Sequence, residues 1–225
     1  MLGKAAIVDL THPIAECSTP ADQPRADPSG GESQTIRDGC GAGKRDFGTR
    51  LTLQATARSD RRTVARIPSR ELLAPAVVVT VAQKVGQFPE YQATVDDLRA
   101  WERKYGRIPK HSVVLLNTGW AARWIEPARY ANPDPYGMPQ VPGFSPAAVV
   151  YLVDERQVRG LGLDAFIPDK PVTRSLNQGV LPAGVWWIEN LDNLDRLPIK
   201  GAKLVIAPLR IEAASAPARV IAILP

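Results

Sequence analysis

A carboxylate at the end of an apolar run is the first candidate for chemistry in this sequence. Residues 185–188 (Val-Trp-Trp-Ile) have the composition of a buried strand, and Glu189 follows them directly. A glutamate at the inner end of such a strand is costly unless it meets a cation, a metal or a hydrogen-bond donor. Glu189 is therefore either an ordinary hydrated carboxylate at a strand end or one ligand of a catalytic metal.

Histidines are too few for a site built on several of them. The chain has only His12, which precedes a proline at the end of an expected strand, and His111, which lies in a polar turn. A single histidine in such a position is more often a turn or surface residue than a metal ligand.

Length and composition limit the class of protein. The 225 residues are 44% hydrophobic and fit one domain, 1–225, with a sizeable core. The net charge of +5 comes from arginines spread along the chain, which does not favour a nucleic-acid partner. No apolar run reaches the length of a membrane span, and Cys17 and Cys40 make no disulfide framework. A reduced, cytoplasmic location without membrane contact is therefore expected.

The regular part of the chain predicts a mixed α/β domain with few helices. Helices are expected from Thr94, with a capping carboxylate at Asp97, to Gly106, and from Ser145 to about Gln157. Apolar, β-branched runs predict the strands, at 5–10, 76–81, 112–118, 159–164, 185–191, 203–209 and 219–224.

Residues 16–62 differ from everything that follows. Among these 47 residues only Ile36, Phe47, Leu51 and Leu53 are large and apolar. This composition cannot bury enough surface to offset the ordering entropy, so the segment is expected to be loop-rich or poorly ordered. A structureless loop of this length is unusual inside a compact domain.

Several motifs together resemble those of the cyclase family, which includes bacterial kynurenine formamidase and isatin hydrolase. The motifs are Val8-Asp9-Leu10-Thr11-His12-Pro13, Val113-Val114-Leu115-Leu116-Asn117-Thr118-Gly119-Trp120, Pro142-Gly143-Phe144-Ser145-Pro146, Val158-Arg159-Gly160-Leu161-Gly162-Leu163-Asp164 and Ile188-Glu189-Asn190-Leu191. The resemblance implies a swivelling β/β/α fold, a homo-oligomer, and hydrolysis of formamides or cyclic amides with bound Zn or Mn. A metal-bound water would attack the polarised carbonyl of a small-molecule substrate.

The family's metal ligands are mostly missing. The resemblance implies ligands from the pattern His-x-Gly-Thr-His-x-Asp-x-Pro-x-His, a later His, and the Glu of Glu-Asn-Leu; Glu189 fills the last of these. The pattern falls on residues 46–56, where only Gly48 and Thr49 agree. The degenerate ligand slots are occupied by Asp46, Arg50, Thr52, Thr56 and, for the later His, Asn177.

No catalytic residue of the family is intact as a consequence. Asp46 could bind a metal, and Thr52 or Asn177 could do so weakly. Arg50 would repel the ion, and Thr56 cannot act as a base near neutral pH. The metal is therefore expected to be absent or weakly bound, and the hydrolase weak or inactive.

Two hypotheses explain this loss. In the first, the chain is a non-catalytic paralogue in which Arg50 pairs with Glu189 or Asp46 and the pocket binds a small carboxylate or an aromatic ligand. In the second, the chain is a frame-damaged copy of an active enzyme. Residues 52–56 are coded ACN CTN CAR GCN ACN, and a reading one base earlier permits Asp-Ala-Pro-Gly-His, the family's Asp-x-Pro-x-His.

A third class of function, a binding scaffold that uses the proline-rich stretch 125–143, has no repeat or exposed apolar motif in its favour.

Overall fold

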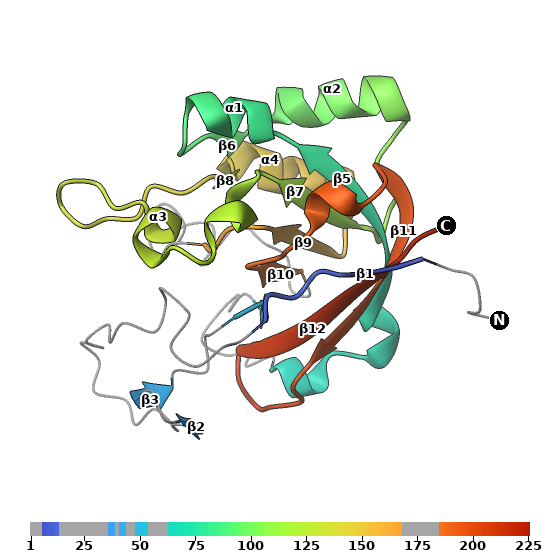
Figure 1. The fold of residues 1–225 in the computed structure, drawn as a ribbon. Coiled ribbons are helices and arrows are strands. Elements are labelled where there is room, and N and C mark those ends of the chain that lie inside the picture. Colours follow the sequence, from blue (N-terminus) through green and yellow to red (C-terminus); the bar gives the residue numbers. More distant parts are fainter. Residues whose placement is uncertain (1–5, 14–35, 39–40, 44–47, 54–62, 168–184) are drawn as a thin grey trace.

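A closed sheet organises the molecule (Figure 1). The computed structural model describes residues 6–13, 36–38, 41–43, 48–53, 63–167 and 185–225. Eight strands follow one another in the order β1-β12-β11-β5-β7-β9-β10-β4, and β4 also pairs with β12. This last pairing closes seven of the strands into a barrel, and β1 lies along β12 beyond β4. The strands are β1 (Ile7–Asp9), β4 (Arg50–Leu53), β5 (Leu73–Thr80), β7 (Val113–Asn117), β9 (Gly160–Leu163), β10 (Trp186–Glu189), β11 (Lys200–Pro208) and β12 (Ser215–Ile223).

The direction of the strands divides the barrel into two parts. Strands β5, β7, β9 and β10 are parallel neighbours. The pairs of β11, β12, β4 and β1 are antiparallel, including the pair of β4 with β10. In open α/β sheets, ligands bind beyond the carboxyl ends of parallel strands. The corresponding edge here is where β7, β9 and β10 end.

Alternation along the strands produces two hydrophobic cores. On β5, β7 and β10 the side chains of Val78, Leu115 and Ile188 pack inside the barrel. Their neighbours Val79, Leu116 and Trp187 pack on the other face, beneath the helices. This period of two explains why the parallel strands, which are buried on both faces, read as continuous apolar runs.

The helices are few, and the longest begins as its sequence predicts. Thr94 caps α2 (Val95–Tyr105), and the side chain of Asp97 accepts from the backbone N–H of Thr94, which completes a capping box. The other α-helices of the described residues are α1 (Ala82–Gln87), α3 (Pro127–Ala131) and α4 (Pro146–Val150). A π-helical turn, η5 (Tyr151–Glu155), continues α4. Figure 1 shows α1, α2 and α4 on one side of the barrel.

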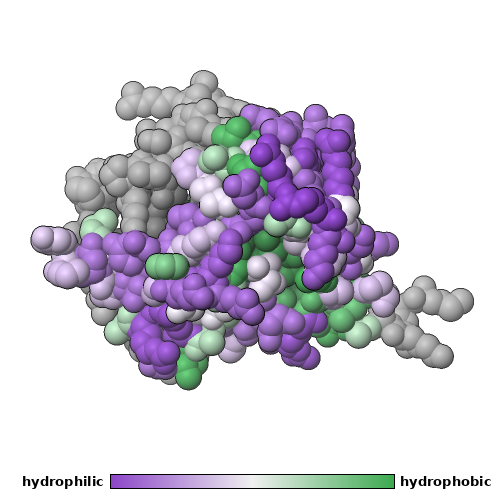
Figure 2. All heavy atoms as spheres, turned by 90° about the horizontal axis from the view of Figure 1, so that it is seen from above, coloured by the Kyte–Doolittle hydropathy of each residue, from purple (hydrophilic) through white to green (hydrophobic). Residues whose placement is uncertain are grey.

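Figure 2 views the molecule from above, the side on which α1 and α2 lie in Figure 1, and this face is dominated by hydrophilic residues. None of the helices in the described part of the chain combines the length and apolar character that a membrane crossing requires.

The structure confirms the expected mixed sheet with few helices. Each strand expected from an apolar run is present, within a few residues of its expected ends. The segment 16–62 contains two short strands, β2 (Ile36–Asp38) and β3 (Gly41–Gly43), which pair with each other, and the barrel strand β4. A further small pair joins β6 (Gln92–Ala93) to β8 (Gly143–Phe144).

Candidate functional site

Strand register places Arg50 directly opposite Glu189. β4 pairs with β10 in antiparallel register, with Arg50 across from Glu189 and Thr52 across from Trp187. Leu51 and Leu53 point into the barrel core, so the period of two turns Arg50 and Thr52 to the other face. Glu189 lies on that same face, because Trp186 and Ile188 occupy the barrel interior.

Three donors hold the Glu189 carboxylate. The Arg50 Nη2 lies 2.8 Å from Glu189 Oε2, which also accepts from the backbone N–H of Ile167 at 2.9 Å. The hydroxyl of Thr52 donates to Oε1 at 3.2 Å. The side chain of Glu189 is 4% exposed and that of Arg50 is 14% exposed. The buried carboxylate thus has the cation and the hydrogen-bond donors that its burial demands.

The residues that agree with the family pattern hold this edge of the barrel together. Asn190, in a left-handed conformation at φ +56°, donates from Nδ2 to the carbonyl of Gly48 at 2.8 Å. Thr49 donates its hydroxyl to the carbonyl of Asn190 and accepts from the backbone N–H of His12 at 3.0 Å. Gly48 adopts φ +66°, which favours glycine. Gly48, Thr49 and Asn190 therefore position the strand ends.

His12 lies in a buried aromatic cluster, where sequence reasoning expected an ordinary turn residue. Its ring stacks on Trp124 at 4.1 Å between centroids, and Trp124 meets Tyr130 edge to face at 5.1 Å. Burial lowers the pKa of His12, although Asp192, 3.7 Å from Nδ1, opposes that shift. Within the described residues, the His12 Nε2 is buried without a hydrogen-bond partner. His12 is therefore a neutral imidazole at neutral pH. His111 is exposed, as expected.

Tyr130 connects this cluster to the ion pair. Its hydroxyl donates to Asn190 Oδ1 at 2.7 Å, and its ring contacts Phe166 at 5.7 Å between centroids. Burial raises the pKa of Tyr130, and the carboxylates of Asp164 and Glu189 raise it further. The phenol is therefore a neutral hydrogen-bond donor at the same edge as Glu189.

A second buried carboxylate, Asp164, ends the neighbouring strand β9. It accepts from the backbone N–H and hydroxyl of Thr118 and from the backbone N–H of Trp120, the last at 3.0 Å. Burial raises the pKa of Asp164 to about 6 in spite of these donors. Sequence reasoning missed Asp164, although it follows a buried strand in the way that Glu189 does.

The described residues do not fit a catalytic metal. They contain no group of three or more His, Cys, Asp or Glu side chains that could hold one. The guanidinium of Arg50 contacts Glu189 Oε2, where its charge would repel a metal ion, and Thr52 supplies a hydroxyl in place of a carboxylate. Of the other degenerate slots, Asp46, Thr56 and Asn177 lie outside the described residues.

Comparison of the sequence and the fold with known proteins identifies the family of this chain. The Cyclase family model matches residues 8–170. An isatin hydrolase from Roseibium aggregatum is 32% identical over 166 residues, which make up 69% of this chain and 61% of that protein. The matched stretch thus spans less than two thirds of that relative.

Solved structures extend the similarity to nearly the whole chain. Isatin hydrolase A from Labrenzia aggregata, bound to benzyl benzoate, is 29% identical with a TM-score of 0.77, over 99% of this chain and 94% of that one. Isatin hydrolase A from Ralstonia solanacearum is 27% identical with a TM-score of 0.78, over 99% and 93%. A potential metal-dependent hydrolase with cyclase activity, 22% identical with a TM-score of 0.67 over 97% of each chain, shares the fold. The chain belongs to the cyclase family, and it is similar to that family's metal-dependent hydrolases.

Proposed function

We propose that this protein is a cyclase-family hydrolase by descent in which an ion pair stands where the family binds its metal. Its hydrolysis of amides, formamides or cyclic amides is accordingly weak or absent. The contact of Arg50 Nη2 with Glu189 Oε2, at 2.8 Å, carries the proposal. A guanidinium keeps its proton at any physiological pH, so it supplies charge but no activated water. The two buried carboxylates and Tyr130 then remain as structural groups.

Metal content and activity test this proposal together. The purified chain is incubated with Zn or Mn, desalted and measured by elemental mass spectrometry, and hydrolysis of isatin and of an N-formyl aniline is followed in the same samples. We expect less metal than one equivalent and little turnover. Near-stoichiometric metal with turnover would contradict the proposal and restore an active metal-dependent hydrolase.

A restored variant provides the matched comparison. Asp46→His, Arg50→His, Thr52→Asp, Thr56→His and Asn177→His together restore the ligand residues of the family, with Glu189 as the remaining ligand. We expect this variant to retain metal that the original chain loses on desalting. Arg50→His alone serves as the control, because one added imidazole does not complete a site.

A frame-damaged coding sequence is the alternative origin of the same site. This alternative is supported by the codons of residues 52–56, which permit Asp-Ala-Pro-Gly-His when they are read one base earlier. Thr52 already donates to Glu189, so an aspartate there would face that carboxylate and require a cation. Resequencing of the genomic locus decides between the two origins, because a confirmed frame removes this alternative.

A ligand-binding role for a non-catalytic paralogue is favoured by the aromatic cluster beside the ion pair. Trp124 and Tyr130 are buried, Phe166 beside Tyr130 is partly exposed, and Arg50 carries a guanidinium, a group that prefers carboxylates. Calorimetric titration with benzoate, and with benzamide as the neutral control, tests it. Preference for benzoate that disappears in Arg50→Met supports this role. We place the protein in the cytoplasm, where a chain without a disulfide framework stays reduced.

A further inference from the structure

An open hollow lies on the helical side of the molecule, apart from Glu189. A hollow of about 410 Å³ is lined by residues of α2, of the segment that follows it, and of η5 with its last turn. Its lining residues are Arg99, Glu102, Arg103, Arg107, Tyr151 and Arg156. Four arginines and one glutamate line the hollow, and a second glutamate, Glu155, lies beside it with Oε2 3.5 Å from Arg156 Nη1, so the arginines still leave a positive excess. None of these residues belongs to the edge at which Glu189 lies.

The glutamate in the lining, Glu102, is already paired with one of the arginines. Arg156 binds Glu102 with two parallel contacts, Nε to Oε1 at 2.7 Å and Nη2 to Oε2 at 2.9 Å. The hydroxyl of Tyr151 donates to Oε2 at 2.6 Å, and the backbone N–H of Ile108 donates to Oε1 at 2.9 Å. Burial would raise the pKa of Glu102, but these contacts outweigh it and hold the pKa at about 2. Glu102 therefore has little capacity left to compensate other cations.

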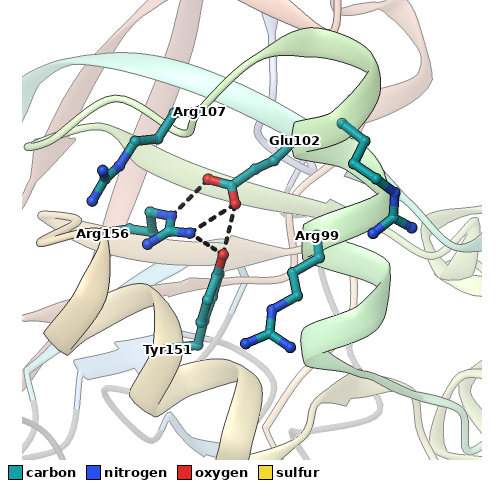
Figure 3. A pocket seen from close by; sticks show the side chains of 6 residues that line it. Arg99, Glu102, Arg107, Tyr151 and Arg156 are labelled. Atoms are coloured by element: carbon teal, nitrogen blue, oxygen red, sulfur yellow. Dashed lines mark hydrogen bonds and ion pairs between the residues drawn. The ribbon is translucent and has the colours of Figure 1, made fainter.

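The remaining three arginines lie around this fixed pair (Figure 3). Within the described residues, Arg99, Arg103 and Arg107 form no ion pair with a carboxylate. Figure 3 shows the guanidinium groups of Arg99 and Arg107 on opposite sides of the Glu102–Tyr151 contact. Arg107 donates to the carbonyl of Glu155 at 3.2 Å. The cations are exposed, so an anion from solvent can reach them.

Tyr151 fixes two of the guanidinium groups in advance. Its ring is buried, with the Cζ of Arg156 4.2 Å and that of Arg99 5.6 Å from its centroid. Cation–π contacts of this kind reduce the side-chain freedom that a ligand would otherwise have to restrict. The hollow is thus partly preorganised.

Helix stability alone does not explain this set of arginines. Arg103 lies in the last turn of α2, where the helix dipole favours a cation. Arg99 lies in the middle of the helix, four residues before Arg103, and like charges at this spacing repel each other. Arg107 and Arg156 come from other segments. An anion bound between the four cations would relieve their repulsion.

We propose that this hollow binds a phosphate-bearing small molecule, such as a diphosphate or a phosphomonoester. Guanidinium groups bind phosphate oxygens through two parallel hydrogen bonds, and several around one hollow suit a multiply charged phosphate. The volume lies within the range of small-molecule sites. The hollow is independent of the Arg50–Glu189 pair, so it serves the protein whether or not that pair allows hydrolysis.

Calorimetric titration of the full chain with inorganic pyrophosphate tests the proposal. We expect saturable binding of one equivalent, weakened about tenfold or more in the double variant Arg99→Gln/Arg103→Gln, because two charge-assisted contacts are lost. The matched control is Arg70→Gln/Arg196→Gln, which removes two exposed arginines elsewhere and the same net charge. Circular dichroism checks that both variants keep the fold.

Three outcomes would overturn the proposal. The first is titration without saturation, and the second is equal weakening in both double variants, which would mean attraction by net charge alone. The third outcome concerns a second probe, a short oligoribonucleotide. If the oligoribonucleotide binds more tightly than pyrophosphate, and if only the variant Arg99→Gln/Arg103→Gln loses this binding, the hollow is a nucleic-acid contact.

Discussion

Arg50 and Glu189 form a largely buried ion pair, so removing either member alone affects the other. Both Glu189 oxygens are occupied, and the Arg50 guanidinium supplies the only full positive charge among the three donors described. Taking away one member of a buried pair leaves the other charge uncompensated, which costs far more than the pair itself contributes. The pair therefore couples the stability of the barrel to the identity of residue 50.

Replacing Arg50 by Met should lower the free energy of unfolding by about 2–4 kcal/mol, a range reduced from the fully buried case because Arg50 is 14% exposed. The double variant Arg50→Met/Glu189→Gln should recover much of that loss, since no buried charge remains. Urea denaturation of the three chains measures both effects. A single variant as stable as the original chain would contradict the assignment of this ion pair.

Asp164 gives stability a pH dependence of unusual sign. Its pKa is about 6 in the folded protein against 3.8 in the unfolded chain, so the folded state binds more protons between these values. Stability should therefore decrease as pH rises towards 6 and level off above it, by about 1.4 kcal/mol for each unit of pKa difference. Glu102, whose pKa is lowered to about 2, acts in the opposite sense below its unfolded pKa of 4.5, and so does His12, whose pKa is lowered, below its unfolded pKa of 6.5. The contribution of Asp164 is therefore the difference from a variant that lacks its carboxyl group.

Urea denaturation at a series of pH values between about 4.5 and 7 checks this dependence. In Asp164→Asn, which has no titrating group at this position, the decrease should disappear. The slope is the decisive quantity, because the amide also loses acceptors for Thr118 and Trp120. Equal slopes in the two proteins would show that Asp164 is not the source.

Single residues were predictable where one rule dominates. A carboxylate after the apolar run at 185–188 had to find a cation or donors, and pairing with Arg50 was one of two hypotheses. His12 was misjudged because a proline and a strand end are local signals, whereas its stacking on Trp124 joins residues more than a hundred positions apart. No local pattern reports such a contact.

Among the elements, β9 shows how glycines set the distance between side chains inside the barrel. A Cβ on Gly160 would lie 2.3 Å from the Trp186 ring, and one on Gly162 would lie 2.7 Å from Leu115. These distances show that β9 packs closely against β10 and β7 at its two glycines. Trp186 is fully buried, so it has little freedom to move away.

Gly160→Ala should therefore destabilise the protein by about 1–3 kcal/mol, the usual cost of overpacking a core. Gly86→Ala is the matched control, because a Cβ there meets nothing within 4 Å. In the interior of α1 an alanine is expected to be neutral or stabilising by up to about 1 kcal/mol. Thermal unfolding of both variants compares them, and a loss of similar size in each would exclude steric overlap as the cause.

Among the seven strands of the barrel, β4 is the one that sequence reasoning did not predict. Arg50-Leu51-Thr52-Leu53 has the polar–apolar alternation of a half-buried strand, but it is four residues long and lies in a segment of loop-like composition. Because the composition was considered over all 47 residues of the segment, the alternation of these four residues was not recognised. The helix α2, with its capping box and terminal glycine, was predictable because its signals lie within one turn of each end.

At the scale of the whole molecule, the resemblance to the cyclase family leads us to expect one domain that assembles into a homo-oligomer. Light scattering coupled to size-exclusion chromatography measures the mass directly. We expect a dimer or a larger assembly of the 24.4 kDa chain. A clean monomer across a range of protein concentrations would contradict this expectation.

The closing strand β12 also decides when the molecule can fold. It pairs with β1 and β4, whose residues precede it by more than 150 positions, so these contacts have very large sequence separations. At about 5–20 residues per second, a ribosome needs roughly 10–45 s to synthesise these 225 residues. During that time β1 and β4 lack their partner, and folding must be late and slow. Removing residues 216–225 would take away most of β12 and therefore prevent barrel closure. It would also leave the edges of β4 and β11 open to aggregation.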